Sequence, residues 1–265
     1  PFQMWVPDVY EGAPTPITGY LSAASKAAGF AVVLRIFYDA FGAPAWLSHN
    51  WGMLFAVLAA LTMTIGNVVA ITQTNIKRMM AYSSIAQAGY MMVGLAAASV
   101  AAAAAPAARS ALVFFLASYT LTNVGAFVAI VAFSNKTGTD TIASYSGMGK
   151  RAPILALGLT TCLVSLVGLP PTAGLIAKIY LFNAAVQQGF MWLVMIAVIN
   201  TVISAYYYLR VVKIMWLGAP ASDEPVPSSA AIRTALTLAC AGILLLGILP
   251  TLVIKLAEMA GKSIS

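Results

Sequence analysis

The sequence predicts an all-α protein, a polytopic transmembrane helical bundle of about seven spans, one of them an interrupted helix. Three observations predict this fold class. Of the 265 residues, 61% are hydrophobic and 8% are charged, whereas soluble domains are roughly 25% charged. The apolar residues are gathered into segments long enough to cross a bilayer, which takes about 20 residues. One segment is far too long for a single crossing and has glycines and prolines at its middle.

The predicted spans are apolar segments bounded by charges, polar turns or Pro/Gly clusters. They are residues 17–38, 51–73, 79–101, 110–134, 153–186, 191–213 and 231–255. No link between them is long enough for a separate soluble domain. We therefore expect a single transmembrane domain over 1–265, with a loop at 1–16, spans over 17–255 and a tail at 256–265. Pro106 indicates a turn in the alanine-rich stretch 96–108, but the end of the third span stays open there.

Segment 153–186 breaks the length rule. As one straight helix it would measure about 51 Å, against a hydrocarbon core of about 30 Å. The run GLPPTAG at 168–174 holds two prolines, which lack a backbone donor, and two glycines. Unwound backbone at membrane depth persists only in a protein interior or a wet cavity, and interrupted helices mark ion and substrate sites in transporters. The alternative is a simple proline kink or a bent surface helix.

The basic residues predict the topology. The net charge is +7, but these residues are scattered singly or in pairs, so nucleic acid is not an expected partner. Eight of them fall on one side of the predicted bundle and four on the other, so the first side, with Pro1, is cytoplasmic and the C-terminus is external. The eight are Lys77, Arg78, Lys136, Lys150, Arg151, Arg210, Lys213 and Arg233, and the four are Arg35, Arg109, Lys255 and Lys262.

The chain begins at Pro1, with neither a methionine nor a signal-peptide pattern. We therefore expect it to be the C-terminal part of a longer protein. The two cysteines, Cys162 and Cys240, lie inside apolar runs and predict no disulfide framework and no metal cluster.

Two lysines fall deep inside predicted spans. Lys26 is near the middle of segment 17–38, and Lys178 follows the interruption by four residues. A lysine at the centre of a spanning helix costs about 2.5–3.5 kcal/mol, and such residues usually mark a proton or ion pathway. Burial disfavours the charged form of lysine, so a buried lysine can gain or lose a proton as its surroundings change. The alternative is a structural lysine bonded to helix-end carbonyls.

The other polar residues favour simpler roles. Lys77 and Arg78 follow a polar turn and are interpreted first as cytoplasmic anchors, with Lys77 kept as a secondary candidate for the proton relay. Asp8 and Glu11 precede the first span and are poor candidates for proton carriers. Four asparagines within spans are expected to hydrogen-bond between helices. These are Asn67, Asn123, Asn183 and Asn200.

Motifs for electron-transfer cofactors are missing. The sequence has no Gly-rich phosphate loop, no cysteine set for an iron–sulfur cluster, no paired histidines for haem and no dinucleotide fingerprint. We therefore expect no cofactor, no metal and no redox centre on this chain.

Three ordered motifs resemble one known family. PFQMWVPDVYEGAPTPITGYLSAASKAAGF, TQTNIKRMMAYSSIAQAGY and GLPPTAGLIAKIYLF resemble the N subunit (subunit 2) family of respiratory NADH:quinone oxidoreductase, complex I, from Pro1 to about Trp216. These are antiporter-like membrane subunits, similar to Mrp-type cation/proton antiporters. The one departure noted is Gln3, where the family often has histidine.

The resemblance implies a proton-translocating subunit of an enzyme of the bacterial inner membrane. By motif position, Lys26 matches the central relay lysine and Lys178 the lysine of the second interrupted helix. A further lysine and its acidic partner are expected upstream of Pro1. The partners implied are other membrane-arm subunits, the lipid bilayer and protons, with NAD, quinone (such as ubiquinone), FMN and iron–sulfur clusters on partner subunits.

Two other functions remain open from the residues. A Mrp-type or stand-alone cation/proton antiporter would have no NADH- or quinone-linked partners. A passive scaffold would tolerate replacement of both deep lysines.

Overall fold

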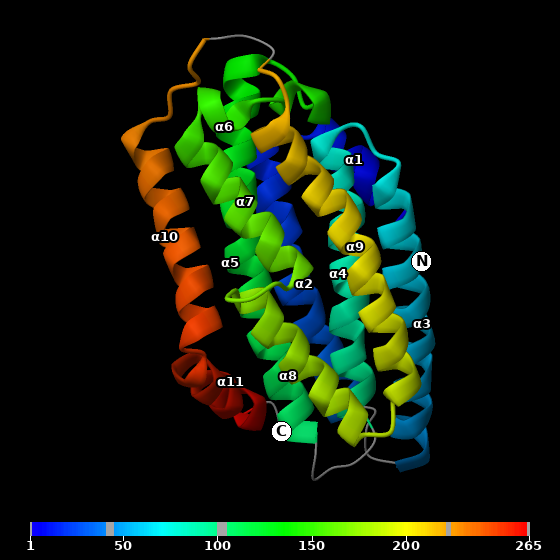
Figure 1. The fold of residues 1–265 in the computed structure, drawn as a ribbon. Coiled ribbons are helices and arrows are strands. Elements are labelled where there is room, and N and C mark those ends of the chain that lie inside the picture. Colours follow the sequence, from blue (N-terminus) through cyan, green and yellow to red (C-terminus); the bar gives the residue numbers. More distant parts are fainter. Residues whose placement is uncertain (1, 41–44, 100–104, 221–223, 264–265) are drawn as a thin grey trace.

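A computed structural model describes residues 2–40, 45–99, 105–220 and 224–263 as a bundle of helices (Figure 1). Most of the helices lie roughly parallel to one common axis, and the chain runs up and down along it. No strand occurs in the described ranges. One isolated bridge, between Asn75 and Thr141, joins two loops at one end. The predicted fold class, a polytopic helical membrane bundle, is confirmed.

The helices succeed one another with short connections. In chain order they are α1 (Val6–Gly12), α2 (Thr15–Leu34), the π-helical η1 (Arg35–Ala40), α3 (Ala45–Ile71), α4 (Ile76–Ala98), α5 (Ala105–Thr137), the 3-10 turn η2 (Ile142–Tyr145), α6 (Met148–Arg151), α7 (Pro153–Val167), α8 (Ala173–Gln187), α9 (Met191–Leu217), α10 (Ala230–Ile248) and α11 (Thr251–Ser263).

The structure has a helix, or for segment 153–186 a pair of helices, at each of the seven predicted spans. Five helical stretches in the described ranges are long and apolar enough to cross a membrane unaided: Thr15–Phe37, Asn50–Ile71, Pro106–Thr137, Met191–Leu217 and Ala230–Ile248. The expected third span is α4, which is more polar and is buried along almost its whole length between the other helices. Because α4 faces protein rather than lipid, serine and glutamine side chains can find partners on it.

The interrupted helix is confirmed. The fifth crossing consists of α7 and α8, separated by residues 168–172. Gly168 ends α7 with φ +89°, a left-handed conformation that glycine adopts without steric cost. On the other side of the break, a Cβ atom on Gly174 would lie 1.8 Å from the Ser165 carbonyl oxygen, so only glycine fits. The segment is two helices and not one helix with a kink.

The last crossing is shorter than predicted. The expected span 231–255 ends as a helix at Ile248, and α11 begins at Thr251 and runs across the end of the bundle (Figure 1). Pro250 lies between the two, and a proline cannot continue a helix because it lacks the N–H donor and its ring clashes with the preceding turn. Lys255 therefore lies on α11 and not at the end of a spanning helix.

Candidate functional site

Lys26 projects from the middle of α2 towards the central helix α4. Its Nζ donates to the Ser22 carbonyl oxygen at 3.2 Å, to Ser84 Oγ, and to the Tyr119 hydroxyl at 3.3 Å. The ammonium also lies 5.2 Å from the centroid of the Tyr119 ring. Three helices, α2, α4 and α5, thus meet at this one charged group.

The hydroxyl groups beside Lys26 form a cluster of their own. Ser84 Oγ shares hydrogen bonds with the Tyr119 hydroxyl at 2.9 Å and with the Tyr10 hydroxyl at 3.2 Å. Hydroxyls both donate and accept, so each can pass a hydrogen bond onwards. Lys26 is only half-buried because it also lines a cavity of about 340 Å³, mostly apolar, bordered by α1, α2, α3 and α4.

Lys178 is held by the end of the broken helix. Its side chain comes from the second turn of α8 and is 5% exposed. Nζ donates to the carbonyl oxygens of Leu166 at 3.1 Å and Val167 at 2.8 Å, which are the last residues of α7. The last carbonyls of a helix have no partners within it and carry partial negative charge, so they suit a cation. These bonds are also those expected if Lys178 is a structural lysine that caps helix-end carbonyls.

Tyr90 completes the surroundings of Lys178. Its ring centroid lies 4.8 Å from Lys178 Nζ, so the ring face stabilises the ammonium. From the central helix, Gln87 donates to the Leu166 carbonyl oxygen at 3.2 Å, the same oxygen that accepts from Lys178. The lysine is thus linked to both sides of the interruption and to α4.

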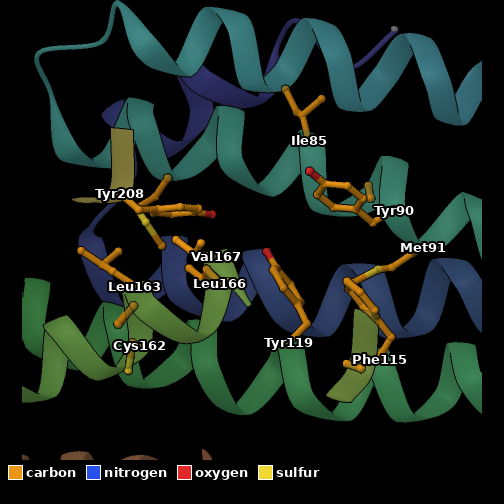
Figure 2. Packing of buried hydrophobic residues seen from close by; sticks show 14 of the residues in the cluster. Ile85, Tyr90, Met91, Phe115, Tyr119, Cys162, Leu163, Leu166, Val167 and Tyr208 are labelled. Carbon is orange, nitrogen blue, oxygen red and sulfur yellow. The ribbon is translucent and has the colours of Figure 1, made fainter. Parts of the chain in front are cut away.

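A small cavity lies between the two lysine environments. It measures about 10 Å³ and is bordered by Tyr119, which bonds Lys26, and by Lys178 itself. That volume is close to the minimum for one water molecule. Ser118 Oγ, on the cavity wall, is buried without a hydrogen-bond partner. Figure 2 shows the Tyr119 hydroxyl directed into the interior near Leu166 and Val167.

The structure therefore connects the surroundings of Lys26 and Lys178 through Tyr119 and this small cavity, whereas Lys77 lies elsewhere. Lys77 lies at the start of α4, about two turns before Ser84. Its Nζ forms an ion pair with Asp140 Oδ2 at 3.4 Å and donates to the Ala13 carbonyl oxygen at 3.0 Å. This pair fixes the end of α4 to the loop before η2.

Arg78, next to Lys77, pairs outside the bundle core. Its guanidinium contacts Asp8 at 2.7 Å and Glu11 at 2.6 Å, both on the short helix α1. The carboxylates of Asp8 and Glu11 thus pair with Arg78 at one end of the bundle and lie apart from the deep lysines.

The interhelical role predicted for the asparagines is confirmed for three of the four. Asn67 on α3 donates to Asn200 Oδ1 on α9 at 3.2 Å, and Asn123 on α5 donates to Ser22 Oγ on α2. Asn183 differs, because it lies on the exposed face of α8.

Four site residues were not predicted from the sequence. Ser84, Gln87 and Tyr90 all lie on α4 at spacings of three, which places them along one helix face. The polar run YSSIAQAGY inside an apolar span was the available signal. Tyr119 carried no such signal, because a tyrosine in a span is ordinary.

In the parts of the chain that the structure describes, no group of three or more His, Cys, Asp or Glu side chains could hold a metal ion. Cys162 and Cys240 are free thiols. The groups available at the site are ammonium, hydroxyl, amide and backbone carbonyl, which bind and move protons or small cations.

Comparisons with known proteins agree with this geometry. Residues 1–204 match the family model described as NADH:quinone oxidoreductase/Mrp antiporter, transmembrane. NADH-quinone oxidoreductase subunit N of Dehalococcoides mccartyi is 49% identical over 264 residues, which are 100% of this chain and 54% of that protein. The chain thus spans about half the length of the curated relatives it matches.

Two solved structures have the same fold. A chain of respiratory complex I from Thermus thermophilus with bound aureothin is 33% identical with a TM-score of 0.80, over 96% of this chain and 54% of that one. A chain of the membrane-bound sulfane sulfur reductase, an archaeal respiratory membrane complex, is 32% identical with a TM-score of 0.86, over 100% of this chain and 52% of that one. The protein is an integral membrane protein, and it belongs to the NADH:quinone oxidoreductase/Mrp antiporter transmembrane family.

Proposed function

We propose that this chain forms part of a membrane-arm subunit of a proton-translocating NADH:quinone oxidoreductase. Quinone reduction takes place elsewhere in the complex and drives protonation changes along the buried lysines. The names of the relatives at 44–50% identity support this enzyme over other members of the family. NAD, quinone, FMN and iron–sulfur clusters belong to partner subunits in this proposal, and none to this chain.

Within the chain, protons pass between Lys26 and Lys178. The single observation that carries this step is Tyr119, which hydrogen-bonds Lys26 and also borders the small cavity at Lys178. A hydroxyl can accept a proton from one side while donating on the other. One water in the cavity, accepting from or donating to Ser118, would complete the connection.

The two lysines are suited to the two ends of such a step. Lys26 has hydroxyl partners, which can donate to a neutral amine as readily as they accept from an ammonium. Lys178 has carbonyl partners, which can only accept and therefore favour the ammonium. A proton reaching Lys178 is thus stabilised there until a change in the broken helix moves those carbonyls.

The chain as a whole is proposed to be a single transmembrane domain in the bacterial inner membrane. The Pro1 side is cytoplasmic and the C-terminus external, as the excess of basic residues on the first side favours. Lys77 remains a secondary relay candidate.

The test replaces each lysine in the full-length subunit. Lys26→Ala and Lys178→Ala should each reduce NADH-driven proton pumping by inverted membrane vesicles at least several-fold, while the complex still assembles. Lys150→Met is the matched control, because Lys150 is an exposed lysine at the end of the bundle. Normal pumping by both assembled variants would refute the relay.

A Mrp-type antiporter has the same fold, so the enzyme assignment needs its own measurement. Native purification of the full-length protein should recover subunits with NADH- and quinone-linked activity. Recovery of the protein with other antiporter subunits alone would favour the second candidate, and this result is independent of the lysine variants.

A further inference from the structure

The last helix, α11, has three distinct faces. Residues three or four positions apart lie on the same side of a helix. Ala257 and Gly261 are buried, Leu256 and Met259 are 52% and 61% exposed, and a third side carries the exposed pair Lys255 and Glu258. A helix packed on its own bundle in water needs only a buried face and a polar face, so the exposed apolar face calls for a partner.

The buried face of α11 fixes its level in the membrane. A Cβ atom on Gly261 would lie 2.4 Å from Ser110 Oγ and 3.1 Å from the Pro106 carbonyl oxygen, so α11 packs closely on the first turns of α5. Helix α5 has 33 residues and is about 50 Å long, well over the hydrocarbon thickness of about 30 Å. At least one end of α5 therefore extends into the headgroup layer, and α11 packs on the first turns of α5, at one of these two ends.

The preceding helix supports the same level. Helix α10 has 19 residues, about 29 Å, which matches one crossing of the hydrocarbon. Its outer side carries exposed leucines and an isoleucine, and Leu245, Ile248 and Leu249 at its end are 57–63% exposed. The chain turns at Pro250 and α11 follows directly at the end of α10 (Figure 1), so the exposed Leu256 and Met259 come soon after the exposed apolar residues of α10 in the chain.

We propose that α11 is an interfacial helix that binds the boundary between lipid headgroups and acyl chains, at the end of the bundle opposite the Lys77–Arg78 turn. Leu256 and Met259 insert among the acyl chains, while Lys255 and Glu258 stay among the headgroups and water. Helices with separate polar and apolar faces typically sit about 5–10 Å into this boundary. The occupant of the exposed apolar face is therefore lipid and not another protein.

Site-specific photo-crosslinking in the full-length protein, in native membranes, tests this inference. p-Benzoylphenylalanine in place of Leu256 or Met259 should give lipid adducts by mass spectrometry, as should the control position Ile248. The same probe in place of Glu258 should give few. Glu258→Cys should react with a membrane-impermeant maleimide from one side of the membrane only.

Two results would overturn the inference. Protein adducts at positions 256 and 259 would show that a partner subunit covers this face. Lipid adducts at Ile248 with none at 256 or 259 would show that α11 does not lie in the bilayer boundary. Neither result depends on proton transport, so the inference stands or falls separately from the proposed function.

Discussion

At the scale of single residues, the two deep lysines differ in what surrounds them. Lys26 is held by the side chains of Ser84 and Tyr119, which can reorient, and Lys178 by backbone carbonyls at the end of α7. Side-chain hydroxyls rotate on a fast timescale, whereas carbonyls move only with the helix that bears them. Lys178 is thus the residue whose environment depends on the geometry of the interruption.

Gly168 provides a test of that dependence. A Cβ atom at this position would lie 3.1 Å from Lys178 Cδ, and φ is +89°. Gly168→Ala should lower the stability by about 1–2 kcal/mol from the left-handed backbone and should also displace Lys178, so proton pumping should fall.

The matched control is Gly189→Ala. Gly189 also has a positive φ, +85°, but its Cβ atom would have no neighbour within 4 Å. It should lose similar thermal stability and keep pumping per assembled complex. Equal loss of pumping in both variants would show that the effect of Gly168 is not transmitted through Lys178.

The ion pair of Lys77 with Asp140 offers a way to decide whether Lys77 is a structural anchor or a member of the proton relay. The side chains are 6% and 26% exposed, so Asp140→Asn leaves a nearly buried ammonium without its charged partner. We expect a loss of about 1–3 kcal/mol in stability, and a smaller loss in the double variant Lys77→Met/Asp140→Asn than the sum of the single ones.

Thermal melting of the purified complex measures the stability, and proton pumping by vesicles measures the relay function. An anchor at Lys77 predicts lower stability with normal pumping per assembled complex. Loss of pumping in an assembled Lys77→Met variant would instead assign Lys77 to the relay.

At the scale of elements, the packing of α10 against α7 is the contact most open to direct test. The Cys240 thiol on α10 donates to the Gly158 carbonyl oxygen on α7 at 3.8 Å, one helical turn before Cys162, although 78 positions of sequence numbering separate the two cysteines. A copper–phenanthroline oxidant in the membrane should therefore join the two thiols in the full-length protein.

Mass spectrometry detects the crosslink as a disulfide-linked peptide pair. After denaturation, the crosslinked cysteines no longer react with maleimide. Cys162→Ser should abolish it and restore labelling of Cys240. Persistence of two free thiols under oxidation that crosslinks a control pair would place α10 elsewhere on the bundle.

At the scale of the whole molecule, the two ends of the bundle carry different elements and can be labelled separately. The end with α1 and α6 carries the Lys77–Arg78 turn and Lys150, and the other end carries α11 and the turn at Gln187 (Figure 1). The proposed orientation predicts that Lys150→Cys is labelled by an impermeant maleimide in inverted vesicles only, and Gln187→Cys in right-side-out vesicles only. The reverse pattern would invert the topology.

The sequence by itself determined most of the architecture. Apolar segments bounded by charges are set by the length of the hydrocarbon core, so the crossings could be located without coordinates. The interruption at 168–174 was equally visible, because proline and glycine act on the backbone locally. Pro250 carried the same local signal within an apolar run, but the run was long enough to be taken as one span, and only the structure placed α11 across its end.

The cost of burying a charge also singled out Lys26 and Lys178 as candidates for a proton pathway, from their positions in the spans alone. Their partners could not be found that way. Ser84 and Tyr119 are distant from Lys26 in the chain and from each other, and the carbonyls of Leu166 and Val167 exist in every sequence. Only the packing of α2, α4, α5 and the broken α7–α8 pair decides which hydroxyls and carbonyls meet a lysine, because hydrogen bonds depend on distances of about 3 Å that local sequence does not set.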